Sequence, residues 1–322
     1  MAVDWTVPID TGSAPQDGEN FDVIVVGGGP GGSAAASYAA MNGNKVLLIE
    51  KAVWPRDKIC GDAVGGKSLR HVKELGVKEM IEATPHFRVT GMLFSSSNGQ
   101  NVTISLPKED VERKEAGYAL PRIQFDYMMF KRATELVIEN NGKVVQGTKV
   151  VEVVHESEPS PRITGVVIEG ESVSSHSAPL VIGAGGWKCP VAKKIVEELN
   201  GDVLQDNDHY CGAYREYWTG VKGVGDEEGS IELHFVDDVI PGYWWIFPVQ
   251  KGVVNVGIGM VISEQRKQTG VKKSLRKLQH KLINEHPLFK ERFEDATMVK
   301  GSGKGWQLPF GSPRKRQKLQ PR

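Results

Sequence analysis

The most constraining feature of this sequence is a strand–turn–helix–strand pattern between residues 22 and 50. Residues 22–27 (DVIVVG) are a short apolar run rich in β-branched residues, which is typical of a buried parallel strand. A glycine-rich turn and an alanine-rich helical stretch follow, and this stretch ends at Gly43. Residues 45–50 (KVLLIE) are a second apolar run, and it ends in Glu50. This order predicts a βαβ unit with two parallel strands.

The glycine turn of this unit fits the pattern G-x-G-x-x-G at Gly27, Gly29 and Gly32. Gly27 permits the tight turn, Gly29 lets the backbone approach a pyrophosphate, and Gly32 lets the helix pack on the strand. Glu50 lies 18 residues after Gly32, where an acid accepts hydrogen bonds from a ribose. Because a carboxylate disfavours a ribose 2′-phosphate, the pattern predicts FAD or NAD rather than NADP.

Composition excludes several other classes of protein. The 40 Lys and Arg residues balance the 40 Asp and Glu residues, so we expect no nucleic-acid partner. The three cysteines, Cys60, Cys189 and Cys211, fit neither a disulfide framework nor a zinc pattern, so we expect no metal site. The N-terminus lacks the basic and apolar regions of a signal peptide. These features predict a globular cytoplasmic protein.

The loop after the second strand, WPRDKICGD, resembles the PR-x-K-x-CG loop of the geranylgeranyl reductase family of flavoproteins. The segment PGYWWIFP resembles the family's Y-x-W-x-F-P signature, and LPRIQFD resembles its R-x-x-F-D motif. The resemblance runs from about residue 21 to residue 313. The segments that carry it are residues 54–62, 120–126, 180–193, 241–248 and 305–309.

The resemblance implies an α/β (α+β) fold like that of p-hydroxybenzoate hydroxylase. Such a fold has a Rossmann-like FAD-binding domain with an inserted antiparallel β-sheet substrate domain. The implied activity is reduction of double bonds in geranylgeranyl chains of archaeal ether lipids or chlorophyll precursors. We therefore expect FAD as cofactor, an isoprenoid lipid substrate, and ferredoxin or a reduced nicotinamide as electron donor. A flavin monooxygenase or halogenase and a non-catalytic nucleotide-binding remnant are the alternatives, since a fold does not fix its chemistry.

On this layout we expect residues 1–19, which are polar, to form a flexible tail. The predicted discontinuous FAD-binding domain comprises residues 20–83, 115–205 and 297–322, and the predicted substrate domain comprises residues 84–114 and 206–296. In the family, a Gly-Asp-Ala segment that contacts FAD follows the region matched by residues 305–309. No such segment stands before Arg322, so we expect the C-terminal part of the FAD domain to be missing.

The resemblance also implies roles for individual residues on the cofactor side. Arg122 is expected to contact the flavin, with a surface arginine at the start of a helix as the alternative. Arg56 and Lys58 either hold the pyrophosphate, line the flavin entrance or are solvated loop cations. In the segment GAGG, Gly185 replaces the family's aspartate, so only backbone contacts to FAD are expected there. The predicted cofactor-binding residues are Gly27, Gly29, Gly32, Glu50, Lys51, Arg56, Arg122, Gly183 and Gly185.

On the substrate side, Cys60 and Gly61 resemble the family's pair beside the flavin and are predicted as the catalytic residues. A small buried thiol is the alternative for Cys60. Tyr243, Trp245 and Phe247 share one face of a strand and are predicted to line an apolar channel for an isoprenoid chain, with ordinary aromatic core as the alternative.

Residues 231–235 and 253–260 alternate in polarity, which predicts half-buried antiparallel strands forming one wall of the substrate pocket. A basic amphipathic helix is predicted over residues 271–282. Such a helix can make a peripheral contact with an anionic membrane, although a solvated surface helix is the interpretation we favour. Its apolar and cationic residues are Val271, Leu275, Leu278, Leu282, Lys272, Lys273, Arg276, Lys277 and Lys281.

Overall fold

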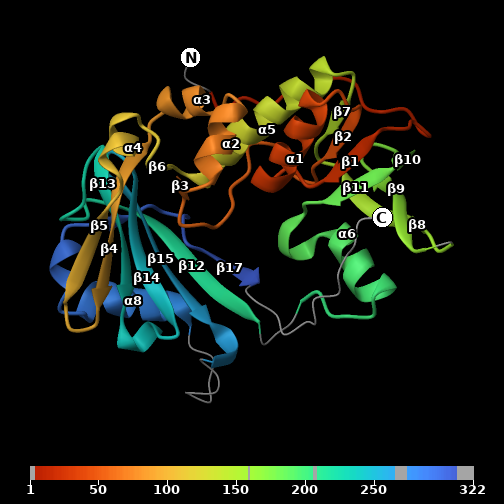
Figure 1. The fold of residues 1–322 in the computed structure, drawn as a ribbon. Coiled ribbons are helices and arrows are strands. Elements are labelled where there is room, and N and C mark those ends of the chain that lie inside the picture. Colours follow the sequence, from red (N-terminus) through yellow and green to blue (C-terminus); the bar gives the residue numbers. More distant parts are fainter. Residues whose placement is uncertain (1–3, 159, 206–208, 265–273, 310–322) are drawn as a thin grey trace.

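The computed structural model describes residues 4–158, 160–205, 209–264 and 274–309. Two lobes lie side by side, one built on a small parallel sheet and the other on a large, mostly antiparallel sheet (Figure 1). The predicted α/β (α+β) class, with a Rossmann-type cofactor lobe, is confirmed.

The parallel sheet has the strand order β11-β1-β2-β7. Its strands are β1 (Val23–Val26), β2 (Val46–Ile49), β7 (Lys143–Val145) and β11 (Leu180–Gly183). Helices α1 (Pro30–Met41) and α5 (Arg122–Glu139) pack against the face that carries Val25 and Leu48. Because successive strand residues point to opposite faces, Ile24 and Leu47 lie on the other side. There they share a core with α6 (Pro190–Lys193) and with the antiparallel strands β8 (Lys149–Glu156) and β9 (Arg162–Glu169), and β10 (Val173–Ser177) pairs with β9.

The large sheet runs in the order β16-β12-β15-β14-β13-β4-β6-β3, with β17 paired to β12 and β5 paired to β4. Helix α8 (Leu275–Glu285) covers one face, and the cofactor lobe adjoins the sheet (Figure 1). The short helices α2 (Ser68–Glu74), α3 (Lys78–Glu82) and α4 (Lys108–Glu112) complete this part. The strands are β3 (Ala63–Gly65), β4 (Phe87–Ser96), β5 (Asn101–Ser105), β6 (Gly117–Ala119), β12 (Tyr210–Thr219), β13 (Glu228–Phe235), β14 (Gly242–Gln250), β15 (Val253–Val261), β16 (Thr297–Met298) and β17 (Lys304–Pro309).

The sheet pairing corrects the predicted domain boundaries. Strands β3 and β6, which we assigned to the FAD domain, continue the large sheet because β6 hydrogen-bonds to β4. Strands β16 and β17 belong to the large sheet for the same reason, since both pair with β12. Residues 310–322, the end of that predicted segment, lie outside the described residues.

The predicted antiparallel arrangement is wrong for one side of β13, which pairs antiparallel with β14 but parallel with β4. The alternating apolar residues of β15 do not face the predicted pocket. Val254, Val256, Ile258 and Met260 pack against α8 on the far face of the sheet. The register explains this, because Val256 pairs with Ile246 and Gly257 pairs with Trp245, so the site face of β15 carries the intervening residues.

The described part of the predicted basic helix begins later than expected, as α8. Leu278 and Leu282 are buried against the sheet, and Lys281 pairs with Asp238 at 2.9 Å. Val271, Lys272 and Lys273 lie outside the described residues. None of the helices within the described ranges is long and apolar enough to cross a membrane.

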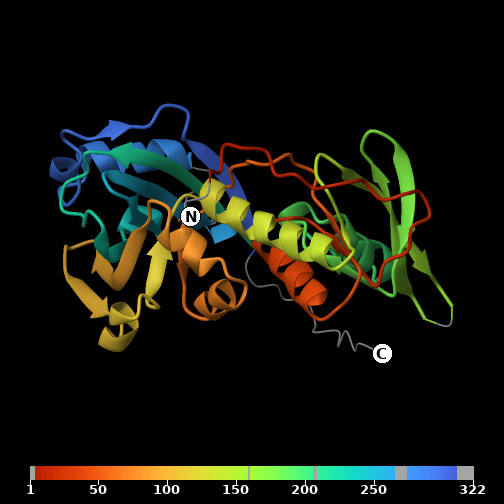
Figure 2. The same ribbon diagram turned by 90° about the horizontal axis from the view of Figure 1, so that it is seen from above.

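Residues 4–19 are not a loose tail, contrary to our expectation. They run along α5 as an extended segment (Figure 2). Ile9 is buried in the core beside Tyr127, whose hydroxyl donates to the carbonyl of Val7 at 2.7 Å. The amide of Gln146 donates to the carbonyl of Ile9 at 2.8 Å. Trp5 also packs against this core, and Lys143 donates to the hydroxyl of Ser13 at 2.6 Å. Apolar contacts and hydrogen bonds that the polar composition hid therefore hold the segment in place.

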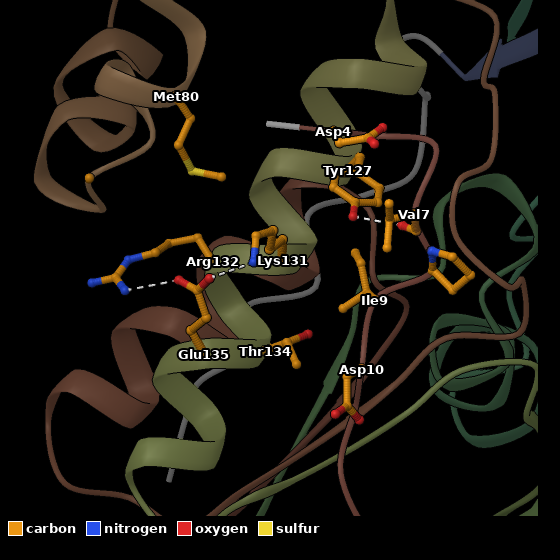
Figure 3. Close-up of a pocket in the computed structure, with 12 residues that line it drawn as sticks. Asp4, Val7, Ile9, Asp10, Met80, Tyr127, Lys131, Arg132, Thr134 and Glu135 are labelled. Atoms are coloured by element: carbon orange, nitrogen blue, oxygen red, sulfur yellow. Dashed lines mark hydrogen bonds and ion pairs between the residues drawn. The ribbon is translucent and has the colours of Figure 1, made fainter. Parts of the chain in front are cut away.

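A cavity of about 730 Å³ lies between this segment and α5 (Figure 3). Lys131 and Arg132 both pair with Glu135, at 3.0 and 3.2 Å, while the lining carboxylates of Asp4 and Asp10 accept the backbone N–H groups of Thr6 and Gly12. We assign this cavity no role in binding.

Candidate functional site

A second cleft, of about 680 Å³, opens where the carboxyl ends of β1 and β2 meet the glycine turn. Ligands of open α/β sheets bind at this edge of the strands. Segments far apart in sequence contribute to the cleft: the turn itself, the end of β2, the loop after it, the first residue of α5, and β17. The lining residues that sequence analysis predicted are Gly27, Gly29, Glu50, Lys51, Arg56, Arg122 and Gly185.

Gly27 and Gly32 shape the turn through their missing side chains. Gly27 has a φ of +111°, and a Cβ there would lie 2.5 Å from the carbonyl oxygen of Ala184. A Cβ at Gly32 would lie 1.7 Å from the carbonyl oxygen of Gly27, so helix and turn can meet only without it. Gly183 also lies behind the cleft, where a Cβ would come within 2.9 Å of Val191. Gly32 and Gly183 therefore act by packing, and neither lines the cleft.

Glu50 closes the turn from the opposite side. Its Oε2 accepts the backbone N–H of Gly28 at 2.7 Å, and its Oε1 accepts the N–H of Ala52 at 2.8 Å. The side chain is buried, yet it lines the cleft. Each carboxylate oxygen retains a second lone pair for a ligand. Glu50 thus fixes the glycine turn as well as offering the predicted acceptor.

Two arginines of the cleft share one buried carboxylate. Arg56 binds Asp126 at 2.7 Å, and Arg122 binds the same group through two nitrogens, Nη2 at 2.9 Å and Nε. Burial disfavours the charged form of Arg122, but Asp126 outweighs it and raises the pKa of the guanidinium. Burial and the nearby charge of Arg122 lower the pKa of Lys58. The arginines are therefore fixed in position, and their side of the cleft is strongly electropositive.

These residues fit a dinucleotide such as FAD. Six cationic side chains and only two carboxylates, Glu50 and Asp57, line the cleft, which suits an anionic diphosphate. The glycine turn leaves its backbone open to the same space. The cations are Lys51, Arg56, Lys58, Arg122, Lys149 and Lys188.

Sequence analysis did not assign Thr148, Lys149, Lys188 or Trp306 to this site. Thr148 lies at the cleft because its backbone N–H donates a hydrogen bond to the carbonyl of Glu50 at 3.1 Å. Trp306 lies on β17, in the matched segment 305–309, but the sequence indicated no role for it. The ammonium group of Lys58 lies 5.8 Å from the centre of its ring. Lys188 likewise lies in a matched segment, residues 180–193, whereas Lys149 reaches the cleft through tertiary pairing, which left no local signal in the sequence.

The predicted catalytic pair lies against the predicted aromatic wall. A Cβ at Gly61 would be 2.9 Å from the ring of Phe247 and 3.7 Å from the indole nitrogen of Trp245. Trp245 and Phe247 are buried, whereas Tyr243 is 39% exposed at the outer end of the row. Cys60 follows the cleft residue Ile59 and interacts with Arg122. The structure therefore brings together the Cys60–Gly61 pair, the wall and the edge of the cofactor cleft.

No cluster of three or more metal-ligating side chains occurs within the ranges that the structure describes.

Two protein families match consecutive parts of the chain. Residues 22–187 match the FAD dependent oxidoreductases, and residues 210–298 match the geranylgeranyl reductase catalytic domain. A menaquinone reductase of Mycolicibacterium smegmatis is 31% identical over 76% of this chain and 56% of its own length. A digeranylgeranylglycerophospholipid reductase of Methanocaldococcus jannaschii is 30% identical over 87% of this chain and 63% of its own length. The chain thus spans less than two thirds of either relative.

Solved structures share the fold. A geranylgeranyl bacteriochlorophyll reductase-like protein from Thermoplasma acidophilum has a TM-score of 0.70 and 23% identity, over 90% of this chain and 66% of its own. The myxobacterial chondrochloren halogenase has a TM-score of 0.71 and 24% identity, over 90% and 64%. The first family match alone covers just over half of this sequence. With a cleft that fits a dinucleotide, the chain belongs to the FAD dependent oxidoreductases, and its residues 210–298 match the geranylgeranyl reductase catalytic domain.

Proposed function

We propose that this chain carries the cofactor site and substrate wall of a reductase that saturates double bonds in geranylgeranyl chains of lipids. The observation that carries the proposal is the contact between Gly61 and the rings of Trp245 and Phe247. Because the Cys60–Gly61 pair follows Ile59, which lines the cofactor cleft, this contact supports an apolar wall near the cofactor. An isoprenoid chain has no polar group near its double bonds, so shape and burial are what a protein can use to hold it.

The residues of the chain have distinct roles in this proposal. Arg56 and the backbone at Gly29 would hold the diphosphate of FAD, Arg122 would contact its flavin, and Glu50 would hold its ribose. Reduced FAD supplies the hydride that an alkene requires, with a proton added to the other carbon. Trp245 and Phe247 bind the chain and exclude water, while Cys60 and Gly61 border the reacting segment. The aromatic wall thereby selects an apolar substrate.

The names of the relatives support a lipid substrate. One is named for a lipid with geranylgeranyl chains and the other for menaquinone, so the headgroup can be a glycerophospholipid or a quinone. A halogenase is the second candidate, because several structural neighbours are halogenases, but their likeness concerns the fold alone. The matched catalytic domain and the aromatic wall favour the reductase.

Two further parts of the proposal concern partners. We propose ferredoxin or a reduced nicotinamide as the electron donor, which stopped-flow reduction of the bound flavin by each donor distinguishes. A peripheral membrane contact would use the exposed cations of α8, among them Arg276 and Lys277. Flotation with anionic and neutral vesicles tests that contact, and equal recovery in both fractions would contradict it.

The main experiment combines the protein with FAD, a chemical reductant and a digeranylgeranyl glycerophospholipid under anaerobic conditions. The expected product is heavier by one hydrogen molecule for each saturated double bond, as measured by mass spectrometry. A protein that binds and reduces FAD but leaves the lipid mass unchanged would contradict the reductase. Halogenation of an aromatic substrate with oxygen and chloride would support the second candidate instead.

A further inference from the structure

One buried amide joins three parts of the site. Asn255, on β15, is fully buried, and its Oδ1 accepts the indole N–H of Trp245 at 2.8 Å. Its Nδ2 donates to the carbonyl of Cys60 at 2.8 Å and to Oδ2 of Asp62 at 2.7 Å. The indole can only donate and the other two groups accept, so the orientation of the amide is fixed by chemistry.

The amide stands in an otherwise apolar strand. Its neighbours Val254 and Val256 point to the opposite face and pack against α8. An apolar side chain would satisfy burial at this position, whereas an amide is costly to bury unless its groups are hydrogen-bonded. Asn255 has such partners only because they converge from β14 and from the loop before β3.

The groups that Asn255 holds are themselves constrained. A Cβ at Gly257 would lie 2.0 Å from the indole of Trp245, so this ring needs the bare backbone of β15 beneath it. Asp62 is fully buried with a φ of +68°, a left-handed conformation that few side chains adopt. The hydroxyl of Tyr217 also donates to Asp62, at 2.5 Å. Such conformations persist where the surroundings fix them, as these contacts do.

We propose that Asn255 is a positioning residue, which sets the ring of Trp245 and the Cys60–Asp62 segment in one fixed arrangement. The wall that binds substrate and the loop that borders the cofactor then move as one unit. For its meaning in catalysis, this inference rests on the proposed reductase function. The arrangement of the loop does not depend on that function and can be tested alone.

The first test measures the alkylation rate of Cys60 by iodoacetamide in the protein without FAD, read by mass spectrometry of its peptide. Replacing Asn255 by Ala releases the Cys60 carbonyl, so we expect the rate to rise about ten-fold, the scale of one or two buried hydrogen bonds. Trp245→Phe, which puts a smaller ring without an N–H in place of the indole, breaks the bond to Asn255 Oδ1 but keeps the bond from Asn255 to Cys60, so it should give a smaller rise. Gln279→Ala is the matched control. Gln279 is as buried as Asn255, but its amide donates to Glu216 on the face of the sheet that α8 covers.

An unchanged Cys60 rate in a folded Asn255→Ala protein would overturn the proposal. If Asn255→Ala does not fold, as thermal unfolding would show, Trp245→Phe decides: a Cys60 rate equal to that of the unaltered protein overturns it equally. A rise in Gln279→Ala of the same size would show general loosening and would also overturn it.

The second test concerns the loaded enzyme. Asn255 does not line the cofactor cleft, so Asn255→Ala should retain FAD affinity within about two-fold while kcat/KM for the lipid falls about ten-fold. In the double variant, the effects of Asn255→Ala and Trp245→Phe should sum to less than the two separate effects, since both changes remove the Trp245–Asn255 hydrogen bond. Additive effects would overturn the proposal. If Asn255→Ala raises the alkylation rate of Cys60 but neither the unaltered protein nor any variant reduces the lipid, the positioning role is supported and the reductase function is contradicted.

Discussion

Arg56 and Asp126, which are 70 positions apart in the chain, form an ion pair of 2.7 Å in which the carboxylate is wholly buried. Arg122 holds the same carboxylate from the start of α5. A single acid thereby orients both arginines that flank the cofactor cleft. The motif resemblance pointed to Arg122, and the structure shows that its position depends on Asp126.

Replacing Asp126 by Asn should weaken both stability and cofactor binding. Removing one member of a buried ion pair leaves charge uncompensated, so we expect unfolding free energy to fall by about 3 kcal/mol. FAD affinity should fall roughly ten-fold, because each arginine loses an interaction that fixes it. Urea unfolding and flavin fluorescence titration measure the two effects. Glu135→Gln is the control on the same helix, since its pairs with Lys131 and Arg132 are exposed and worth little.

The strands and the βαβ unit could be predicted because they depend on local periodicity. The pairing of side chains that are far apart in the sequence could not be predicted, because it leaves no local pattern. Glu232 and His234 alternate with apolar residues, which indicated a solvated face, yet both are buried. Arg292, from a distant segment, neutralises Glu232 at 2.6 Å and makes that burial tolerable. The sequence of β13 alone does not indicate that Arg292 will pair with Glu232.

The same distinction applies to the site. Gly27, Gly29 and Glu50 belong to one sequence motif of defined spacing, so the sequence predicts that they lie in the same site. Asn255 and Tyr217 meet Asp62 only through the order of strands in the large sheet. The polar composition of residues 4–19 likewise gave no indication that Ile9 and Trp5 pack against the core of the cofactor lobe.

Glu50→Gln should impair FAD binding even though the shape of the side chain is conserved. Both carboxylate oxygens accept backbone N–H groups, and the amide nitrogen of Gln would face one of them as a second donor. We expect FAD affinity to fall at least ten-fold by fluorescence titration. Lys51→Gln, next in sequence and exposed, is the control for a change of charge at the cleft. Equal losses in the two variants would argue against a specific role for the carboxylate.

Asp62 should make stability depend on pH. Burial raises its pKa to about 6, against the opposing effects of Tyr217 and Arg215. The native state thus holds this proton more tightly than the unfolded chain, whose aspartates titrate near pH 4. The stabilising contribution is complete below about pH 4 and is lost as the pH rises through about 6, a change of about 3 kcal/mol.

Asp62→Asn should remove this dependence. The measurement is the difference in unfolding free energy between the two proteins, by urea denaturation between pH 4 and pH 8. The difference should change in favour of the variant as the pH rises, because Asn cannot ionise. A difference that stays constant over this range would show that Asp62 titrates normally in the folded protein.

Gly257→Ala tests whether the indole of Trp245 must lie on bare backbone. A methyl group there would overlap the ring, which is fully confined between β15 and the Cys60–Gly61 segment. Displacing the ring costs packing and the bond to Asn255, so we expect a loss of about 1–3 kcal/mol in unfolding free energy. The affinity for the lipid should fall by a larger factor than the affinity for FAD, because Trp245 belongs to the wall and not to the cleft. Gly65→Ala, in β3 of the same sheet, meets no atom within 4 Å and should leave both affinities unchanged. If Gly257→Ala instead matches Gly65→Ala in stability and lipid binding, the indole can rearrange freely and the fixed wall is excluded.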